Sequence, residues 1–319
     1  MIVPIIYPSA GEFWLNSDVY SLLGYSLNSR KLTNLPVSYA YDISAYDAED
    51  ISAILNLQLP LHVTSPDIRF KRHGTHCVTQ ARSLPFPEKS FVHFRKQQYD
   101  IYIASPELCF VQAARKLEFT DLVRFGYDLC SIYYPDVSSA YKQRNRISFT
   151  SASLLKEYAV KNHSLYGSAS ARKALRYVHD YSNSPMETRI ALFFCLPIEC
   201  GGCAIPDIEL NKAIRLTDVG RILNGCNELR ADLAVTRKKI AIEYNSNAFH
   251  LTPEQYSVDM NRQIGISQAG WKYIPITAGS LRSVHSLTDI ANIIRKQLRL
   301  LELNSNDRAR HDLFFKLFK

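Results

Sequence analysis

Two strand-like segments joined by a short turn constrain the fold of this chain most. Residues 229–235 read LRADLAV and residues 239–245 read KIAIEYN, so apolar and polar side chains largely alternate along each segment. Alternation of this kind is typical of β-strands, in which successive side chains point to opposite faces. The short connection between the two segments predicts an antiparallel hairpin.

The hairpin carries one carboxylate on each strand. A turn centred on residues 237–238 places Asp232 directly opposite Glu243, with their Cβ atoms about 4.5–5.5 Å apart. Like charges so placed repel, and a divalent cation between them removes the repulsion. Because Mg²⁺ prefers oxygen ligands and few carboxylates, the pair predicts a site for Mg²⁺ or Mn²⁺.

The two faces of the hairpin have different predicted roles. Asn245 shares the face of Glu243, because strand side chains alternate. The opposite face is predicted to pack under helices and consists of Leu233, Val235, Ile240, Ile242 and Tyr244. The alternative is a solvated polar face, on which Arg230 and Lys239 form ion pairs with the two acids.

Two further residues are candidates for the same site. Glu187 occupies the third helical position after Ser184, which is typical of a capping box, and it also supplies a third acidic group. His250 follows the second strand by five residues. A histidine there could transfer a proton or bind a phosphate. Asp259 and Arg262 lie one turn apart on the next predicted helix, where a surface ion pair is the simplest interpretation.

The second half of the chain shows a regular order of elements. We predict a helix, three strands, a helix, a strand and a closing helix, over residues 184–196, 209–216, 229–235, 239–245, 252–270, 271–277 and 287–303. Thr252 and Gln255 form a capping-box pattern at the start of the second of these helices. The tail, residues 305–319, contains three phenylalanines and is expected to dock on the body.

The first half is predicted to be α+β and then helical from about residue 105. Strands are expected at 59–65 and 89–95, and Ser105 with Pro106 predicts a helix start. Residues 136–151 are polar and are predicted to form a linker, followed by a pair of helices. We therefore expect two domains: residues 1–150, a regulatory or DNA- or partner-binding region, and residues 151–319, with a core at 184–301.

The order of helices and strands predicts an α/β protein, and its charge is compatible with a polyanionic partner. The net charge is +8, and residues 151–319 contribute 23 Lys and Arg against 16 Asp and Glu. A basic excess suits DNA, although a solvated basic surface explains it equally well. No apolar run is long enough to span a bilayer, and the N-terminus lacks a positively charged leader, so we expect a cytoplasmic protein without a membrane partner.

The cysteines indicate reduced thiols. The chain has seven, an odd number, as expected of a protein without a disulfide framework. One C-x-x-C pair, Cys200 and Cys203, and the cluster His73, His76 and Cys77 have suggestive spacing. Zinc needs two further ligands, and the other cysteines do not form a second closely spaced pair. Structural roles are therefore favoured for these residues.

Several motifs in residues 184–285 together resemble a known nuclease family. They are SPMETR, RADLAV, IAIEYNSNAFH, D-x-x-R and AGWKYIPIT. They are similar to the very-short-patch-repair endonuclease-like branch of the PD-(D/E)XK superfamily, as found fused to AbiEi-type antitoxin or regulator regions in bacteria. The resemblance implies a restriction-endonuclease-like core with a mixed central sheet flanked by helices.

The resemblance also implies roles for individual residues. Asp232 and Glu243 correspond to the metal-binding acids, and Glu187 corresponds to the helical glutamate of the core. Asn245 occupies the position of the superfamily lysine, which is a departure from the family pattern. An amide cannot take a proton at neutral pH, so Asn245 cannot replace the lysine in proton transfer. His250 would then assume the lysine's role, and Lys238, Lys239 and Lys272 are substitutes in space.

The predicted function is metal-dependent hydrolysis of DNA phosphodiester bonds, in phage defence or DNA repair. Arg189, Arg262 and Lys272 are the predicted phosphate contacts. The alternative is a catalytically inactive DNA-binding regulator, similar to an antitoxin, that retains the nuclease fold. A third interpretation is a scaffold for a protein partner, and a homodimer is compatible with all three.

Overall fold

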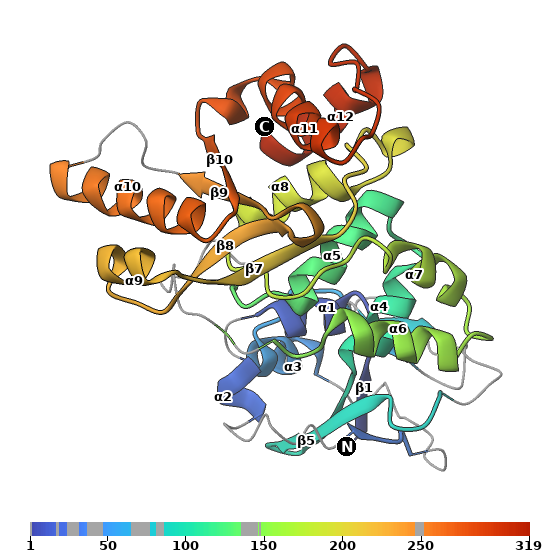
Figure 1. Cartoon of the computed structure of the whole chain (residues 1–319). Helices are drawn as coiled ribbons and strands as arrows, with labels where there is room; N and C mark the ends of the chain where they lie inside the picture. The colour runs from blue at the N-terminus through green and yellow to red at the C-terminus, as the bar shows by residue number, and fades with distance from the viewer. Residues whose placement is uncertain are drawn as a thin grey trace. The chain divides into compact units, whose positions relative to one another are not determined.

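The computed structural model describes residues 2–16, 19–23, 32–36, 47–64, 77–80, 86–134, 146, 148–245 and 252–319. The chain divides into two compact units. Unit 1 comprises residues 1–130 and 134–178, and unit 2 comprises residues 131–133 and 179–319. Both units combine helices with a mixed β-sheet, as the predicted α/β class requires (Figure 1).

The described part of unit 1 contains a six-stranded sheet in the order β2-β5-β6-β1-β3-β4. Its strands are β1 Ile2–Ile5, β2 Leu32–Thr33, β3 Leu61–Thr64, β4 Cys77–Gln80, β5 Phe91–Lys96 and β6 Tyr99–Ala104. Its helices are α1 Ser9–Leu15, α2 Val19–Leu23, α3 Ala48–Leu55, α4 Pro106–Ala113, α5 Phe119–Cys130, α6 Ala152–Lys161 and α7 Ser168–Ala174. The predicted strands at 59–65 and 89–95 are confirmed as β3 and β5.

The start of α4 is confirmed in atomic detail. The Ser105 side chain accepts a hydrogen bond from the Leu108 amide at 3.3 Å, and Pro106 occupies the first helical turn. Serine satisfies an amide that has no partner within the helix, and proline loses no bond there.

The described part of unit 2 contains a four-stranded sheet in the order β10-β9-β8-β7. Its strands are β7 Ile208–Arg215, β8 Glu228–Val235, β9 Ile240–Asn245 and β10 Lys272–Thr277. Its helices are α8 Pro185–Cys195, α9 Asp218–Asn224, α10 Pro253–Gln268, α11 Val284–Gln297 and α12 Arg308–Phe318. The strands and the helices α8, α10 and α11 were predicted, and the capping box of Thr252 and Gln255 at α10 is confirmed.

The hairpin of β8 and β9 has the predicted register. Leu233 pairs with Ile242 and Val235 with Ile240 in antiparallel orientation, and a short 3₁₀ turn joins the strands. Strand β10 returns parallel to β9 after α10, so Pro275 lies beside Glu243. The sheet is therefore mixed, with an antiparallel meander and one parallel edge strand.

Both faces of the hairpin are buried, which differs from the expected division into a core face and an open face. Leu233 and Ile242 are fully buried, and on the other face Ala234 and Ala241 pack against Ile266 of α10. Helix α9 lies beside α10 (Figure 1). The small alanine side chains allow α10 to approach the sheet, which alternation alone does not reveal.

The tail of unit 2 forms helix α12. Phe314 is 2% exposed, and its ring centroid lies 6.2 Å from that of Phe193 on α8. The expected docking of the tail on the body is confirmed.

The observed division differs from the boundary predicted at residue 150. Helices α6 and α7 were expected in the C-terminal domain, but residues 134–178 group with unit 1. Their burial explains this, because Leu155, Ala159 and Ala171 pack inside unit 1. Within the described residues, no helix is long and apolar enough to cross a membrane.

Candidate functional site

Neighbouring strands of unit 2 bring two carboxylates together. Extending the observed register by one residue places Asp232 of β8 opposite Glu243 of β9. An Asp232 carboxylate oxygen accepts a hydrogen bond from the Tyr244 amide at 2.8 Å. Glu243 is only 4% exposed. The predicted juxtaposition of the two acids is therefore present, with Glu243 buried and Asp232 half-buried.

Helix α10 supplies a cation to this pair. Arg262 donates from Nε to Glu243 Oε2 at 3.1 Å and from Nη2 to Oε1 at 3.0 Å, and it also binds the Arg230 carbonyl. This bidentate geometry is the strongest form of a guanidinium–carboxylate bond. Arg262 was predicted as a phosphate contact or as the partner of Asp259, and the structure instead places it on a candidate metal ligand.

The third acid enters from the first turn of α8. The Ser184 side chain accepts from the Glu187 amide at 3.2 Å, and Glu187 Oε2 accepts from the Asn183 amide at 2.9 Å. The carboxylate therefore binds the amide one residue before the usual capping-box position. These bonds hold the Glu187 side chain at the N-terminal end of α8, and α8 lies against β8.

The three acids share an electrostatic environment. Burial raises the pKa of Glu187 to about 7, with the charges of Asp232 and Glu243 adding to the effect. Burial and Asp232 raise the pKa of Glu243 to about 7, despite the opposing effect of Arg262. Burial also raises the pKa of Asp232, against its bond from the Tyr244 amide. The cluster therefore holds protons, or a cation, at neutral pH.

Asn245 and Tyr273 form a polar pair beside the acids. Tyr273 lies opposite Ala241 across the parallel β9–β10 pair, which places it on the face of Glu243 and Asn245. The Asn245 amide donates to the Tyr273 hydroxyl at 3.5 Å, and burial raises the pKa of this tyrosine. Sequence reasoning missed Tyr273, although its period-two position in strand 271–277 was a usable signal.

Other predicted residues lie away from the cluster or outside the described residues. Lys272 is exposed and pairs with Ile240, whereas Pro275 is the residue of β10 beside Glu243. Lys272 therefore lies about 10 Å from Glu243 along the strand direction and on the opposite face of the sheet. Arg189 is exposed on α8. His250 lies outside the described residues.

The solvated-face alternative does not describe the two acids. Arg230 forms its ion pair with Glu228 at 3.3 Å, on the same strand. Lys239 adopts a left-handed backbone conformation at the hairpin turn, at the other end of β9 from Glu243. Neither cation is the observed partner of Asp232 or Glu243.

The cluster offers few ligands for a cation. In the described part of the chain, no group of three or more His, Cys, Asp and Glu side chains is placed to hold a metal ion. A cation would thus depend on Asp232, Glu243, a main-chain carbonyl and water. Arg262 occupies one lone pair on each Glu243 oxygen, and each oxygen retains a second. The donor set fits a hard, oxygen-preferring ion.

The C-x-x-C pair has a different environment. Cys203 is fully buried, and burial raises the pKa of its thiol to about 12. The structural role that was favoured for this pair stays a prediction. His73 and His76 lie outside the described residues.

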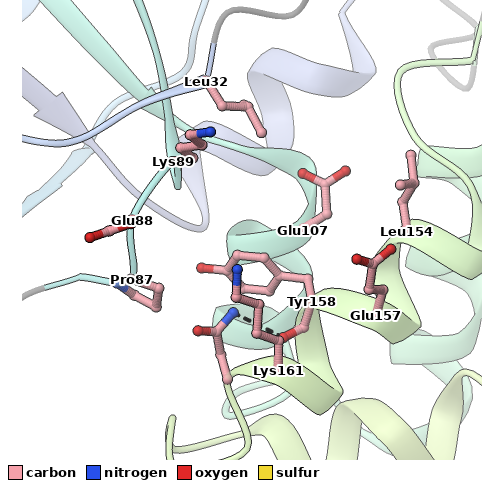
Figure 2. Close-up of a pocket in the computed structure, with 10 residues that line it drawn as sticks. Leu32, Pro87, Glu88, Lys89, Glu107, Leu154, Glu157, Tyr158 and Lys161 are labelled. Carbon is pink, nitrogen blue, oxygen red and sulfur yellow. Dashed lines mark hydrogen bonds between the residues drawn. The ribbon is translucent and has the colours of Figure 1, made fainter.

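Unit 1 contains a cavity of about 380 Å³ (Figure 2). Its lining includes Glu88, Lys89, Glu107, Glu157 and Lys161, so it mixes acids and cations. Glu107 is 5% exposed and accepts a hydrogen bond from the Thr150 hydroxyl at 2.6 Å. All lining residues belong to unit 1, so this cavity is separate from the carboxylate cluster of unit 2.

Comparisons with models of protein families, with curated proteins and with solved structures gave no match for this chain. Interpretation of the carboxylate cluster therefore rests on its geometry, its electrostatics and the resemblance of its sequence motifs.

Proposed function

We propose that unit 2 is a nuclease domain of the PD-(D/E)XK type, which hydrolyses DNA phosphodiester bonds with a divalent cation. The order α8, β7, α9, β8, β9, α10, β10, with three antiparallel strands and a parallel edge strand, supports this proposal. The motif resemblance over residues 184–285 assigns the acids of the nuclease family to Glu187 on α8, Asp232 on β8 and Glu243 on β9.

A single observation carries the proposal. Glu187, Asp232 and Glu243 come from three different elements of unit 2, and the charge of Asp232 adds to burial in raising the pKa of both glutamates. Burying three acids together is costly, because each charged form is disfavoured by burial and by its neighbours. Such an arrangement is typical of a site that binds a cation or transfers protons.

Asp232, Glu243 and the Tyr244 carbonyl are the proposed ligands of Mg²⁺ or Mn²⁺. When bound, such an ion supplies Lewis acidity and lowers the pKa of water. The glutamate protons must leave for a cation to bind, so affinity for the ion would rise as the pH passes 7.

The chain's own residues have distinct roles in this proposal. Glu187, whose pKa of about 7 suits proton transfer at neutral pH, is the candidate general acid or base. Arg262 orients the Glu243 carboxylate. Asn245 and Tyr273 supply an amide and a hydroxyl that can hold a water or a phosphate oxygen. Exposed Arg189 and Lys272 remain candidates for DNA phosphates, and His250 remains a candidate proton carrier.

A catalytically inactive DNA-binding regulator is the second candidate function. Two observations favour it: Asn245 stands where the resembled superfamily has lysine, and Arg262 neutralises Glu243 without a metal. In that case the guanidinium would replace the cation and the cluster would be structural.

The test is a cleavage assay on supercoiled DNA in Mg²⁺, Mn²⁺ or EDTA. We expect metal-dependent nicking, and a loss on the order of 100-fold or more in Asp232→Asn and Glu243→Gln. Glu228→Gln is the matched control, because Glu228 lies on the same strand as Asp232 but is exposed and paired with Arg230. Activity in this control should be unchanged.

The outcomes separate the two functions. Nicking that is lost in both site variants supports the nuclease. No nicking in any metal, by folded protein that binds DNA more weakly as salt increases, supports the regulator. Nicking that persists in Asp232→Asn would refute the proposed site.

A further inference from the structure

One short segment of unit 1, which the structure describes completely, carries a net positive charge. Residues 151–178 contain five Lys and Arg against a single Glu, so they supply +4 of the net charge of +8. Residues 179–319 contain 18 against 15, a net charge of +3. More than half of the +7 excess of residues 151–319 therefore lies in the segment 151–178, which contains α6 and α7 and groups with unit 1.

Four of these cations are exposed and have no acidic partner among the described residues. They are Lys156 and Lys161 on α6, Lys173 on α7, and Arg176 two residues after the end of α7; we call these four cations the basic helix pair. In unit 2, at least six of the 18 lysines and arginines have an acidic partner among the described residues, as in the pairs Lys212–Glu209 and Arg221–Asp218. Unpaired like charges on adjacent helices repel, and a polyanion relieves that repulsion.

The helices that carry these cations are held together. Arg172 of α7 donates to the Ala159 carbonyl of α6 at 3.2 Å, and Leu155, Ala171 and Ala174 are buried beneath the two helices. The two helices lie against each other (Figure 1). The four cations therefore extend from a packed scaffold rather than from an unsupported segment of chain.

An exposed aromatic ring lies in the connection between the two helices. Tyr166 is 76% exposed, and the Arg115 guanidinium carbon lies 4.7 Å from the centre of its ring. Lys116, the next residue after Arg115, is also exposed. Cations combined with an exposed aromatic side chain are typical of surfaces that follow a nucleic-acid backbone and stack on its bases.

We propose that the basic helix pair binds the phosphate backbone of DNA. Lysine and arginine contacts to phosphates supply affinity without sequence information. This inference goes beyond the proposed cleavage site, because its surface lies in the unit that does not carry the three clustered acids. It concerns binding alone and holds whether or not unit 2 cleaves DNA.

The test measures binding of the full chain to a fluorescent duplex DNA by anisotropy, in EDTA and over a range of salt concentrations. The test variant carries four charge-neutralising substitutions, K156Q, K161Q, K173Q and R176Q. The control variant loses the same charge from exposed positions of unit 2, through K296Q, R299Q, R308Q and K319Q. Arg172 is left intact because its bond to Ala159 is structural.

We expect the test variant to bind about tenfold more weakly or worse near 0.1 M salt. Its plot of log affinity against log salt should be shallower by about 0.9 for each lost phosphate contact, while the control variant keeps a slope close to that of the wild type. Two half-variants, K156Q/K161Q and K173Q/R176Q, guard against misfolding, and each should show part of the effect.

Equal weakening in the test and control variants would overturn the proposal, because binding would then depend on net charge alone. Unchanged binding in the test variant would overturn it as well. The outcome of the cleavage assay is independent of this binding test. Loss of nicking in Asp232→Asn with normal DNA binding bears only on the proposed nuclease site.

Discussion

Replacing Glu187 by glutamine should stabilise unit 2 at alkaline pH. Burial and the neighbouring acids raise the pKa of this carboxyl from its ordinary value of 4.5 to about 7. The folded state therefore binds a proton that the unfolded state has released between these pH values. The contribution of the protonated Glu187 carboxyl to the free energy of unfolding is fully present below pH 4.5, and it is lost as the pH rises through 7.

The magnitude follows from the two pKa values. They differ by about 2.5, and each unit corresponds to about 1.4 kcal/mol, so ionised Glu187 costs about 3 kcal/mol above pH 8. At pH 5.5 the cost is only about 1 kcal/mol, because the folded state keeps the proton. Glutamine cannot ionise, and its carbonyl oxygen can still accept the bond from the Asn183 amide. Glu187→Gln should therefore gain about 2 kcal/mol more at pH 8 than at pH 5.5.

Urea unfolding of unit 2 measures this difference. The chain has two tryptophans, Trp14 in unit 1 and Trp271 in unit 2. A Trp14→Phe background leaves Trp271 as the reporter of unit 2. The free energies of unfolding with and without the Glu187→Gln substitution would be compared in this background at pH 5.5 and pH 8.

Thr217→Ala is the control, because it removes the side-chain cap of α9 in unit 2 without touching the bonds of Glu187. It should cost about 1 kcal/mol at both pH values. A stability change in Glu187→Gln that is the same at both pH values would refute the raised pKa. Destabilisation at pH 8 would show that the bonds of the carboxylate outweigh its burial.

Three further predictions concern packing and pairing in unit 2. Arg262→Gln loses both bonds to Glu243, so unit 2 should lose about 2 kcal/mol at pH 8, and less at pH 5.5 where Glu243 is protonated, in the same urea assay. Gly201→Ala should lower stability by about 2 kcal/mol or more and expose α12 to limited proteolysis, because Gly201 has φ +82° and an added Cβ would meet the Ala309 carbonyl. Phe314→Ala should cost about 3–5 kcal/mol by thermal unfolding, because this side chain is 2% exposed. Wild-type stability in any of these variants would contradict the contact concerned.

Local features of the fold were predictable from the sequence. The hairpin register, the capping box of Thr252 with Gln255, and the start of α4 at Ser105 are all confirmed. Each depends on residues within a few positions of one another, where backbone geometry limits the choices. Helix α9 was missed, because its short sequence has no strong periodic pattern.

Features that depend on distant residues were predicted incompletely. Arg262 was identified as a functional residue, but its partner Glu243 lies 19 residues away in sequence. Tyr273 joins Asn245 through the parallel pairing of β10 with β9, whose register depends on how α10 packs on the sheet. The division at residue 178 depends on where Leu155 and Ala171 are buried, and linker composition does not encode this.

The sequence by itself determined the hairpin, its register and the pairing of Asp232 with Glu243, because strand alternation and turn position are local properties. Only the tertiary structure decided that Glu243 is buried, that its charge and that of Asp232 act on Glu187, and that Arg262 binds Glu243. The physical reason is that burial and charge coupling depend on which helices cover the sheet. That arrangement results from packing between segments far apart in the chain.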